Sequence, residues 1–163
     1  MVRGLAETGA YRYDARVRAI LQRVSRAEVR VAGWVIGSIR RGFVVLLGVG
    51  RGDTEGDADC LVDRIVGIRV FADDADKMNL AIGPVGGELL VISQFTLHAD
   101  TSQRRPSFTN AAPPDEARRL YEYFISRARD RGVKVATGDF GAHMDVELIN
   151  DGPVTIILDS KER

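Results

Sequence analysis

Polar residues follow directly on an apolar stretch of the chain at Ser93-Gln94-Phe95-Thr96. Residues 88–92 are typical of a buried strand, so this change marks a candidate site at the end of a rigid element. Hydroxyls or backbone N–H groups there could face a pocket and stabilise an oxyanion, or the hydroxyls could simply bond the backbone where the strand ends. If the strand continues to His98, Thr96 and His98 share one face and could act as nucleophile and base. A histidine on a surface loop is the simpler interpretation.

A second candidate is Asn150-Asp151-Gly152-Pro153, which stands between two β-branched stretches and predicts a tight turn. Proline removes a backbone donor beside a strand, and the peptide bond before a proline can be cis. Because glycine has no side chain, backbone carbonyls at Gly152-Pro153 could approach a ligand closely.

A third stretch, residues 103–108, combines Arg104 and Arg105 with Phe108 in a long polar segment. Arginine beside an aromatic ring suits an RNA strand, because the cation can bind phosphate while a base stacks on the ring. A solvated loop explains the same residues equally well.

The sequence does not support a phosphate-binding loop, a metal site or a disulfide. No glycine-rich loop leads into Lys-Ser or Lys-Thr, and the glycine-dense residues 48–52 favour a tight turn over a phosphate cradle. The two histidines, His98 and His143, lack the spacing of paired metal ligands, so we expect no metal site. The single cysteine, Cys60, excludes an intramolecular disulfide and a cysteine-based zinc cluster.

Composition indicates one globular domain. The chain has 163 residues, 45% of them apolar, and 23 basic residues balance 23 acidic ones. Zero formal net charge excludes a globally basic nucleic-acid binder but leaves room for a local basic patch. We find no apolar run long enough for a bilayer and no secretory h-region near the N-terminus, so we expect a cytoplasmic protein.

The periodicity of the chain predicts the elements that must position these candidates. We expect residues 1–16 to be a poorly ordered leader and residues 17–163 to form the domain. One helix is predicted after a cap at Asp53 or Thr54, and another from Pro114 to a C-cap at Gly132. The fold class expected is α/β: a compact single domain with mixed β-sheets, about seven strands in β/β/α layers, and two main helices. Strand-like patterns begin at Arg18 and cover residues 18–24 and 28–31, and further strands are predicted at 34–39, 42–49, 88–97, 133–136, 143–149 and 154–158.

Ser93-Gln94-Phe95-Thr96, followed after the second helix by residues 150–155, resembles the paired signature of the D-aminoacyl-tRNA deacylases (the D-tyrosyl-tRNA deacylase family). Residues 21–24, 77–80, 105–108 and 120–124 are similar to the same family. The resemblance runs from about Val17 to the last strand and leaves residues 1–16 outside it.

The resemblance implies a homodimer that hydrolyses the ester between a D-amino acid and the terminal adenosine of tRNA, a chiral proofreading step in translation. Glycyl-tRNA would also be accepted. The implied partners are the aminoacylated 3′ end of tRNA and a second copy of the chain, with no DNA and no membrane. No cofactor is implied. The catalytic residues implied are Ser93, Gln94, Phe95 and Thr96 in one subunit. The substrate-binding residues implied are Gly152 and Pro153, joined by a cis bond and supplied by the other subunit, together with Phe108. We also assign Arg23 to substrate binding, since it could hold the Gly-Pro turn from within the first strand.

Two aspects of the mechanism can be argued from the residues. An aminoacyl ester is already activated, and an unassisted threonine hydroxyl is a poor nucleophile, so we expect water attack rather than attack by Thr96. The resemblance to the family implies that the ribose 2′-OH assists the water. If carbonyls at Gly152-Pro153 bind the substrate amino group, an L side chain points into packed backbone and a D side chain points outward. Two other functions stay open: an RNA-docking module without turnover, and a hydrolase of other small esters or amides that uses Thr96 and His98.

Overall fold

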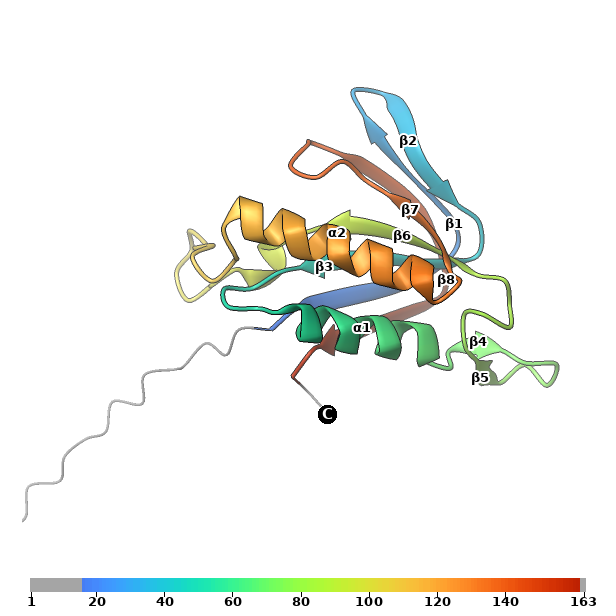
Figure 1. Ribbon diagram of the computed structural model, residues 1–163. Coiled ribbons are helices and arrows are strands. Elements are labelled where there is room, and N and C mark those ends of the chain that lie inside the picture. The colour runs from blue at the N-terminus through green and yellow to red at the C-terminus, as the bar shows by residue number, and fades with distance from the viewer. Residues whose placement is uncertain (1–15, 162–163) are drawn as a thin grey trace, which may run out of the picture.

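The computed structural model describes residues 16–161, so the leader expected over residues 1–16 lies outside the described residues except for Arg16. Figure 1 shows a sheet of long strands with two helices packed against one of its faces. The elements in chain order are β1 (Arg18–Val31), β2 (Trp34–Ile39), β3 (Gly42–Gly48), α1 (Glu55–Gly67), β4 (Phe71–Ala72), β5 (Met78–Leu80), β6 (Glu88–Ser93), the 3-10 turn η1 (Phe95–His98), α2 (Pro114–Asp130), β7 (Lys134–Thr137) and β8 (Asp145–Asp159).

Six strands form one mixed sheet in the order β2-β1-β3-β6-β7, and β8 pairs with β1. One edge of β1 is shared: its first half pairs with β3 and its second half with β2, while β8 follows the other edge along nearly the whole strand. β3, β6 and β7 are parallel to one another. The short strands β4 and β5 form a separate hairpin that the periodicity did not predict.

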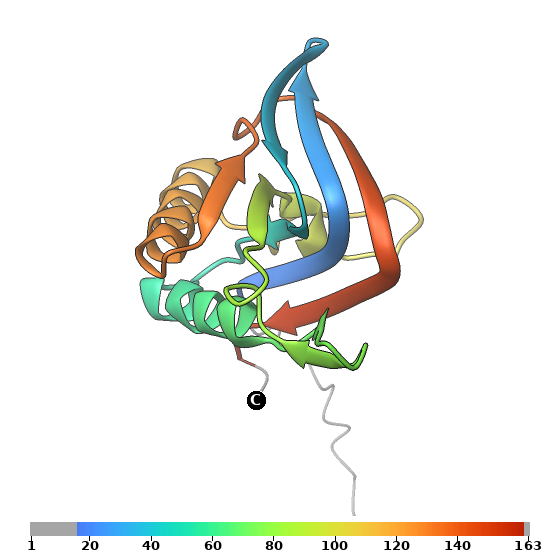
Figure 2. The same ribbon diagram turned by 90° about the vertical axis from the view of Figure 1, so that its right-hand side faces the viewer.

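The sheet curves so strongly that both of its faces are buried. Toward the helices, Phe43, Val45 and Leu47 of β3 pack with residues of α1 and α2 in the main core. Toward the inside of the curve, Val44 packs with residues of β1, β2 and β6 in a second cluster. Figure 2 shows β1 and β8 bending together around this inner side, away from the helices. The expected β/β/α layering is therefore confirmed, and the continuous apolar run of β3 reflects burial on both faces.

The predicted ends of the helices are confirmed. Thr54 caps α1 in a capping box with Asp57, and Pro114 stands in the first turn of α2. Gly132 follows the last turn of α2 with a φ of +80°, a conformation that glycine adopts without steric cost. Within residues 16–161, neither helix has the length and the apolar character that crossing a membrane requires.

The two longest strands run without interruption. β1 includes both strand-like stretches, 18–24 and 28–31, and stays paired with β8 along nearly its whole length. The tight turn expected at Asn150-Asp151-Gly152-Pro153 is wrong, because β8 continues through these residues and joins the predicted strands 143–149 and 154–158. Asp151–Val154 instead form a bulge, since they lie between the pairs Gln22–Thr155 and Val24–Asn150 and so face the single residue Arg23.

Candidate functional site

A cavity of about 730 Å³ opens at one edge of the main sheet. The carboxyl ends of the parallel strands β3, β6 and β7 meet at this edge, which is where ligands of α/β sheets commonly bind. Val49 follows β3, Ser93 ends β6, and residues 140–144 after β7 supply the facing wall. Most of the lining is apolar, and its polar side chains are those of Arg51, Ser93, Gln94 and His143.

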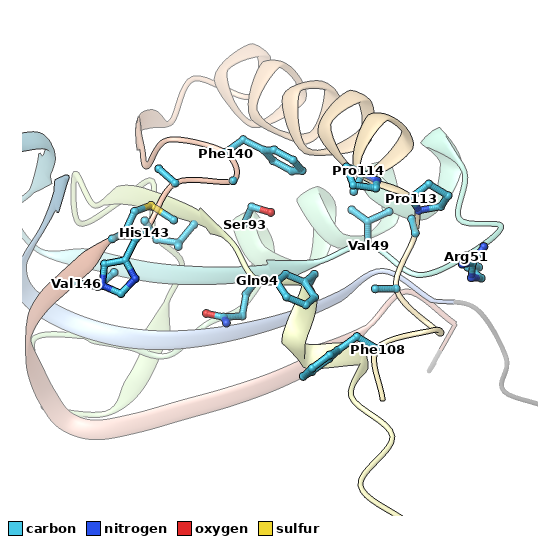
Figure 3. A pocket seen from close by; sticks show the side chains of 18 residues that line it. Val49, Arg51, Ser93, Gln94, Phe108, Pro113, Pro114, Phe140, His143 and Val146 are labelled. Carbon is cyan, nitrogen blue, oxygen red and sulfur yellow. The ribbon is translucent and has the colours of Figure 1, made fainter. Parts of the chain in front are cut away.

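Ser93 brings a hydroxyl into the middle of this cavity. Its side chain lies between Phe140 on one wall and Gln94 and Phe108 on the other (Figure 3). The half-buried hydroxyl hydrogen-bonds no side chain or backbone group of residues 16–161. It is therefore placed to bond a molecule that enters the cavity.

β6 ends at Ser93, and the single 3-10 turn η1 follows after Gln94, so the expected continuation of the strand to Leu97 is wrong. The turn packs closely on β3 because residue 48 is a glycine. A Cβ at Gly48 would lie 2.9 Å from the carbonyl oxygen of Gln94 and 3.1 Å from Cδ2 of His98. Gly48 thus sets how near the Gln94–Thr96 segment lies to the sheet.

The 3-10 turn separates Thr96 from His98. With three residues per turn, residues two apart point in different directions. Thr96 is exposed, and its Oγ1 accepts a hydrogen bond from Nε2 of Gln94, whereas His98 is only 1% exposed. The two residues share no strand face, and His98 is not the surface histidine that the sequence suggested.

His98 belongs instead to a charged cluster beneath the turn. Arg18 donates from Nη1 to the carbonyl oxygen of Leu97 at 3.1 Å and from Nε to Oδ1 of Asp159 at 2.8 Å. Burial lowers the pKa of His98, and the positive charge of Arg18 lowers it further. A hydrogen bond with the backbone of Gly48 acts in the opposite direction but does not outweigh burial. Burial opposes ionisation of Asp159, but hydrogen bonds and charge from Arg18, with a contribution from Arg16, outweigh it and lower the pKa of that carboxyl. The cluster thus holds a neutral imidazole beside an ionised carboxylate.

Three aromatic rings shape the cavity. Phe95 and Phe108 meet edge to face with 5.2 Å between ring centroids, although Phe95 is 56% exposed. On the facing wall, Phe140 packs against Tyr121 at 5.7 Å, and the guanidinium of Arg118 lies 4.7 Å from the centroid of Phe140. Tyr121 is fixed in turn, because its hydroxyl donates to the carbonyl oxygen of Val91 at 2.9 Å.

Arg23 contacts the bulge of β8. Its Nε donates to the carbonyl oxygen of Asp151 at 3.0 Å, and its Nη1 donates to the carbonyl oxygen of Val70 at 2.5 Å. A Cβ at Gly152 would lie 3.0 Å from Nη2 of Arg23, so the guanidinium lies against the Gly-Pro segment. The Gly152–Pro153 peptide bond is cis, and both residues are exposed.

The structure therefore divides the residues singled out from the sequence into two groups. Ser93, Gln94, Phe95 and Phe108 line one cavity, and Thr96 is hydrogen-bonded to one of them. Arg23, Gly152 and Pro153 do not line this cavity and form a separate group on β1 and β8.

Sequence reasoning missed much of the cavity wall, including Arg51, Phe140 and His143. Arg51 follows β3, and the other two follow β7, so the signal is their place just beyond strands that turn out to be parallel neighbours. That signal can be used only once the strand order is known, and the strand order depends on contacts distant in sequence.

The part of the chain that the structure describes contains no cluster of metal ligands. Across residues 16–161, no three side chains of histidine, cysteine, aspartate or glutamate gather as metal ligands would. The glycine-dense segment after β3 is a turn, in which Asp53 N–H donates to the carbonyl oxygen of Gly50 at 3.3 Å.

Comparison with known proteins identifies the family. The family model described as D-Tyr-tRNA(Tyr) deacylase matches residues 20–159. The chain belongs to this family. Three relatives named D-aminoacyl-tRNA deacylase come from Thermotoga petrophila, Clostridioides difficile and Dehalococcoides mccartyi, with identities of 52%, 54% and 56%. Each match covers 90% of this chain and 97% or more of the relative.

Two solved structures share the fold of this chain. One, named c-Myc DNA Unwinding Element Binding Protein, is 39% identical, with a TM-score of 0.82 over 86% of this chain and 97% of that one. Another, named as a probable eukaryotic D-amino acid tRNA deacylase, is 17% identical with a TM-score of 0.79 over 88% of this chain and 99% of that one. The second likeness concerns the fold alone.

Proposed function

We propose that this protein is a D-aminoacyl-tRNA deacylase, which hydrolyses the ester between a D-amino acid and the 3′-terminal adenosine of tRNA. Family membership supports the reaction class. The observation that carries the proposal is the placement of Ser93 and Gln94 at the carboxyl end of β6, on the wall of a cavity of about 730 Å³ with aromatic sides. Such a cavity has the size and character that a nucleoside-sized ligand requires.

The terminal adenosine is the group that fits the apolar part of the cavity. Unpaired RNA bases are commonly bound by stacking on aromatic side chains. The rings of Phe95, Phe108 and Phe140 offer such surfaces, and the hydroxyl of Ser93 offers a polar contact between them. We assign Phe108 to substrate binding on this ground.

The reacting ester lies, in this proposal, beside Gln94, Phe95 and Thr96. The first hydrogen bond of the turn runs from Leu97 N–H to the carbonyl oxygen of Gln94, so the N–H groups of Phe95 and Thr96 precede it. These two donors are suited to the negative charge that develops on the carbonyl oxygen during hydrolysis. Water attacks, and the 2′-OH of the terminal ribose assists.

Selection of D-amino acids requires a surface that excludes L side chains, and we assign this surface to residues other than Ser93–Thr96. Gly152 and Pro153 are exposed and do not line the cavity of their own chain, so we place them in the site of a second copy, as a homodimer allows. Exposed apolar side chains on the same strand, Ile149 and Ile157, suit such a contact. A wall that excludes L side chains cannot exclude glycine, which has none, so glycyl-tRNA is a further substrate.

The deciding experiment is hydrolysis of matched D- and L-tyrosyl-tRNA by the purified protein with EDTA present. We expect fast loss of the D-ester, survival of the L-ester and no effect of EDTA. Equal cleavage of both esters would indicate a general esterase. No cleavage with retained tRNA binding would indicate an RNA-docking module. Because aminoacyl-tRNA is used in the cytoplasm, we place the protein there.

Mixing two variants tests the cross-subunit site. A dimer that combines a Gln94→Ala subunit with a Pro153→Ala subunit would contain one site in which both segments are intact. Because Gly152-Pro153 is the proposed wall against L side chains, Pro153→Ala alone should hydrolyse the L-ester as well, and we expect the mixed dimer to regain selectivity for the D-ester. No gain in selectivity, with mixed dimers demonstrated by mass, would place Gly152-Pro153 in the site of its own chain or outside chiral selection.

A further inference from the structure

Arg51 stands apart from the other residues of the cavity because it is the member of the lining with a permanent charge. It follows β3 and lies at the end of the cavity beyond Pro113 and Pro114, while His143 lies at the opposite end (Figure 3). An apolar chamber with one cationic end suits a ligand that has an apolar body and an anion at one side.

The guanidinium of Arg51 is held in place but not neutralised. Its Nε donates to the carbonyl oxygen of Thr109, and its backbone N–H donates to the carbonyl oxygen of Asn110 at 3.0 Å. No carboxylate of residues 16–161 pairs with it, unlike Arg119 and Arg127, which bind Glu55 and Asp59. The bond from Nε fixes the plane of the guanidinium, whose terminal nitrogens form the fork that binds phosphate well.

The segment that Arg51 anchors carries two further arginines. Asp100 and Ser107 close this loop by exchanging backbone hydrogen bonds of 2.7 and 3.0 Å, and Arg104 and Arg105 lie exposed between them. Neither arginine pairs with a carboxylate in the described part of the chain. Arg105 precedes Phe108 by three residues, so their backbones lie within roughly 11 Å of each other.

The acidic residues that lie near these arginines in the sequence bind other groups. Oδ2 of Asp53 accepts from the backbone N–H of Gly50 at 2.6 Å, Glu55 pairs with Arg119, and Oδ1 of Asp100 accepts from the backbone N–H of Ser102 at 2.9 Å. Arg51 at the mouth of the cavity, and Arg104 and Arg105 on the loop that leads to Phe108, are thus three arginines without a carboxylate partner among residues 16–161.

We infer that Arg51, Arg104 and Arg105 bind the phosphates of the single-stranded RNA end, on the 5′ side of the nucleoside that occupies the cavity. This inference rests on the proposed function for the identity of that nucleoside. When a terminal nucleoside fills the chamber, its 5′ phosphate lies outside, and the mouth lined by Arg51 is the cationic one. The RNA strand thus enters past Arg51, and the loop of Arg104 and Arg105 follows it outward.

Salt dependence separates a phosphate contact from a structural role. We would measure binding of the RNA oligonucleotide ACCA, with no amino acid attached, by fluorescence anisotropy over a range of salt concentrations. Arg51→Gln should weaken binding roughly three- to tenfold and reduce the slope of log Kd against log salt by about 0.7, the value for one phosphate contact on a single strand. Arg51→Lys keeps the charge and should keep the slope. The double variant R104Q/R105Q, which removes two charges, should reduce the slope by more than Arg51→Gln does.

A matched control is available at the other end of the molecule. Arg69 is exposed and bonds Asn79 of β5 at 2.8 Å, and the β4–β5 hairpin lies on the opposite side of Figure 1 from the loop of Arg104 and Arg105. Arg69→Gln should leave both the affinity and the slope unchanged. An equal loss of slope in Arg69→Gln would show a general charge effect and would overturn the inference.

Two substrates separate this inference from the proposed function. Arg51→Gln should raise the KM for D-tyrosyl-tRNA several-fold more than the KM for 3′-O-D-tyrosyl adenosine, which has no phosphate. Equal damage to both substrates, with the salt slope kept, would mean that Arg51 only holds the loop. If the wild-type protein cleaves neither ester, the proposed function fails, while the ACCA titration still decides whether Arg51 binds phosphate.

Discussion

Nε2 of Gln94 donates a hydrogen bond to Oγ1 of Thr96 across the start of the 3-10 turn. The threonine hydroxyl is thereby held by an amide, which cannot accept a proton as a general base would. His98, the basic side chain next along the chain, is buried on another side of the turn. The geometry gives Thr96 a fixed orientation without activating it.

We therefore expect Thr96→Ala to keep substantial activity. The backbone N–H groups that we propose as oxyanion donors remain in the variant, and loss of a single hydrogen bond at an exposed residue disturbs the fold by only about 1 kcal/mol. The expected change in single-turnover hydrolysis of D-tyrosyl-tRNA is a decrease of less than about tenfold, which corresponds to 1.4 kcal/mol.

The control for this prediction is Thr101→Ala, an exposed threonine on the neighbouring loop. It should behave as the wild-type protein does. Complete loss of activity in Thr96→Ala, with an unchanged melting temperature and unchanged binding of tRNA, would restore Thr96 as the nucleophile.

Local signals were sufficient to predict the elements that do not depend on distant partners. The apolar run of β3 predicts a buried strand, and the cap at Thr54 and the proline in the first turn of α2 each predict where a helix begins. The continuity of β8 could not be predicted in this way. Asn-Asp-Gly-Pro favours a turn locally, but pairing with β1 on both sides of Arg23 converts it to a bulge.

Lowering the pH should destabilise the fold through His98. Burial holds the pKa of this imidazole below its ordinary value of 6.5, so the unfolded chain takes up a proton at a higher pH than the folded chain does. Stability rises with pH wherever the unfolded state binds more protons, so the free energy of unfolding should decrease as the pH falls below about 6.5. Urea unfolding at pH 7.5 and pH 5.5 measures this decrease.

The carboxylates do not obscure this effect, because those with a lowered pKa, such as Glu88 and Asp159, have ordinary values of 4.5 and 3.8. The stability that they contribute is present above these values and is lost only at lower pH. His98→Gln should therefore show a smaller difference between pH 7.5 and pH 5.5 than the wild-type protein. An unchanged difference would assign the pH dependence to other groups.

Tyr121→Phe should lower stability with little effect on hydrolysis. The hydroxyl bonds the carbonyl oxygen of Val91 in the core, and burial raises the pKa of Tyr121 to about 12, so the group stays a neutral donor. Removing one such bond costs about 1 kcal/mol, although Gly138 N–H still donates to the same carbonyl. Because the ring that supports Phe140 remains, denaturant unfolding should change and kcat should not. A large fall in kcat would give the hydroxyl a role in the site.

The division of the candidate residues into two groups is the feature of the site that sequence reasoning alone could not supply. The motif around Ser93 and the motif around Gly152 are both recognisable, yet they occupy different parts of one chain. The cavity walls added by the structure, such as Phe140, come together only through the parallel order of β3, β6 and β7.

Arg23 should control chiral selection through the bulge of β8. Its side chain holds the carbonyl oxygens of Asp151 and Val70 and lies against Gly152. Arg23→Gln removes the fork that binds both carbonyls, so the Gly-Pro segment should become less rigid and the wall against L side chains less strict. We expect the ratio of D- to L-tyrosyl-tRNA hydrolysis to fall roughly tenfold, equivalent to 1.4 kcal/mol, with D-ester hydrolysis reduced less.

A matched variant separates this effect from a general loss of stability. Arg26 lies three residues further along β1, is exposed and pairs with Glu147 of β8 at 3.3 Å, so Arg26→Gln removes a β1–β8 contact away from the bulge. Because an exposed ion pair contributes only about 0–1 kcal/mol, Arg26→Gln should keep the D-to-L ratio. If Arg23→Gln lowers the melting temperature but leaves the ratio unchanged, Arg23 supports the fold and another group holds the Gly-Pro segment in its selective position.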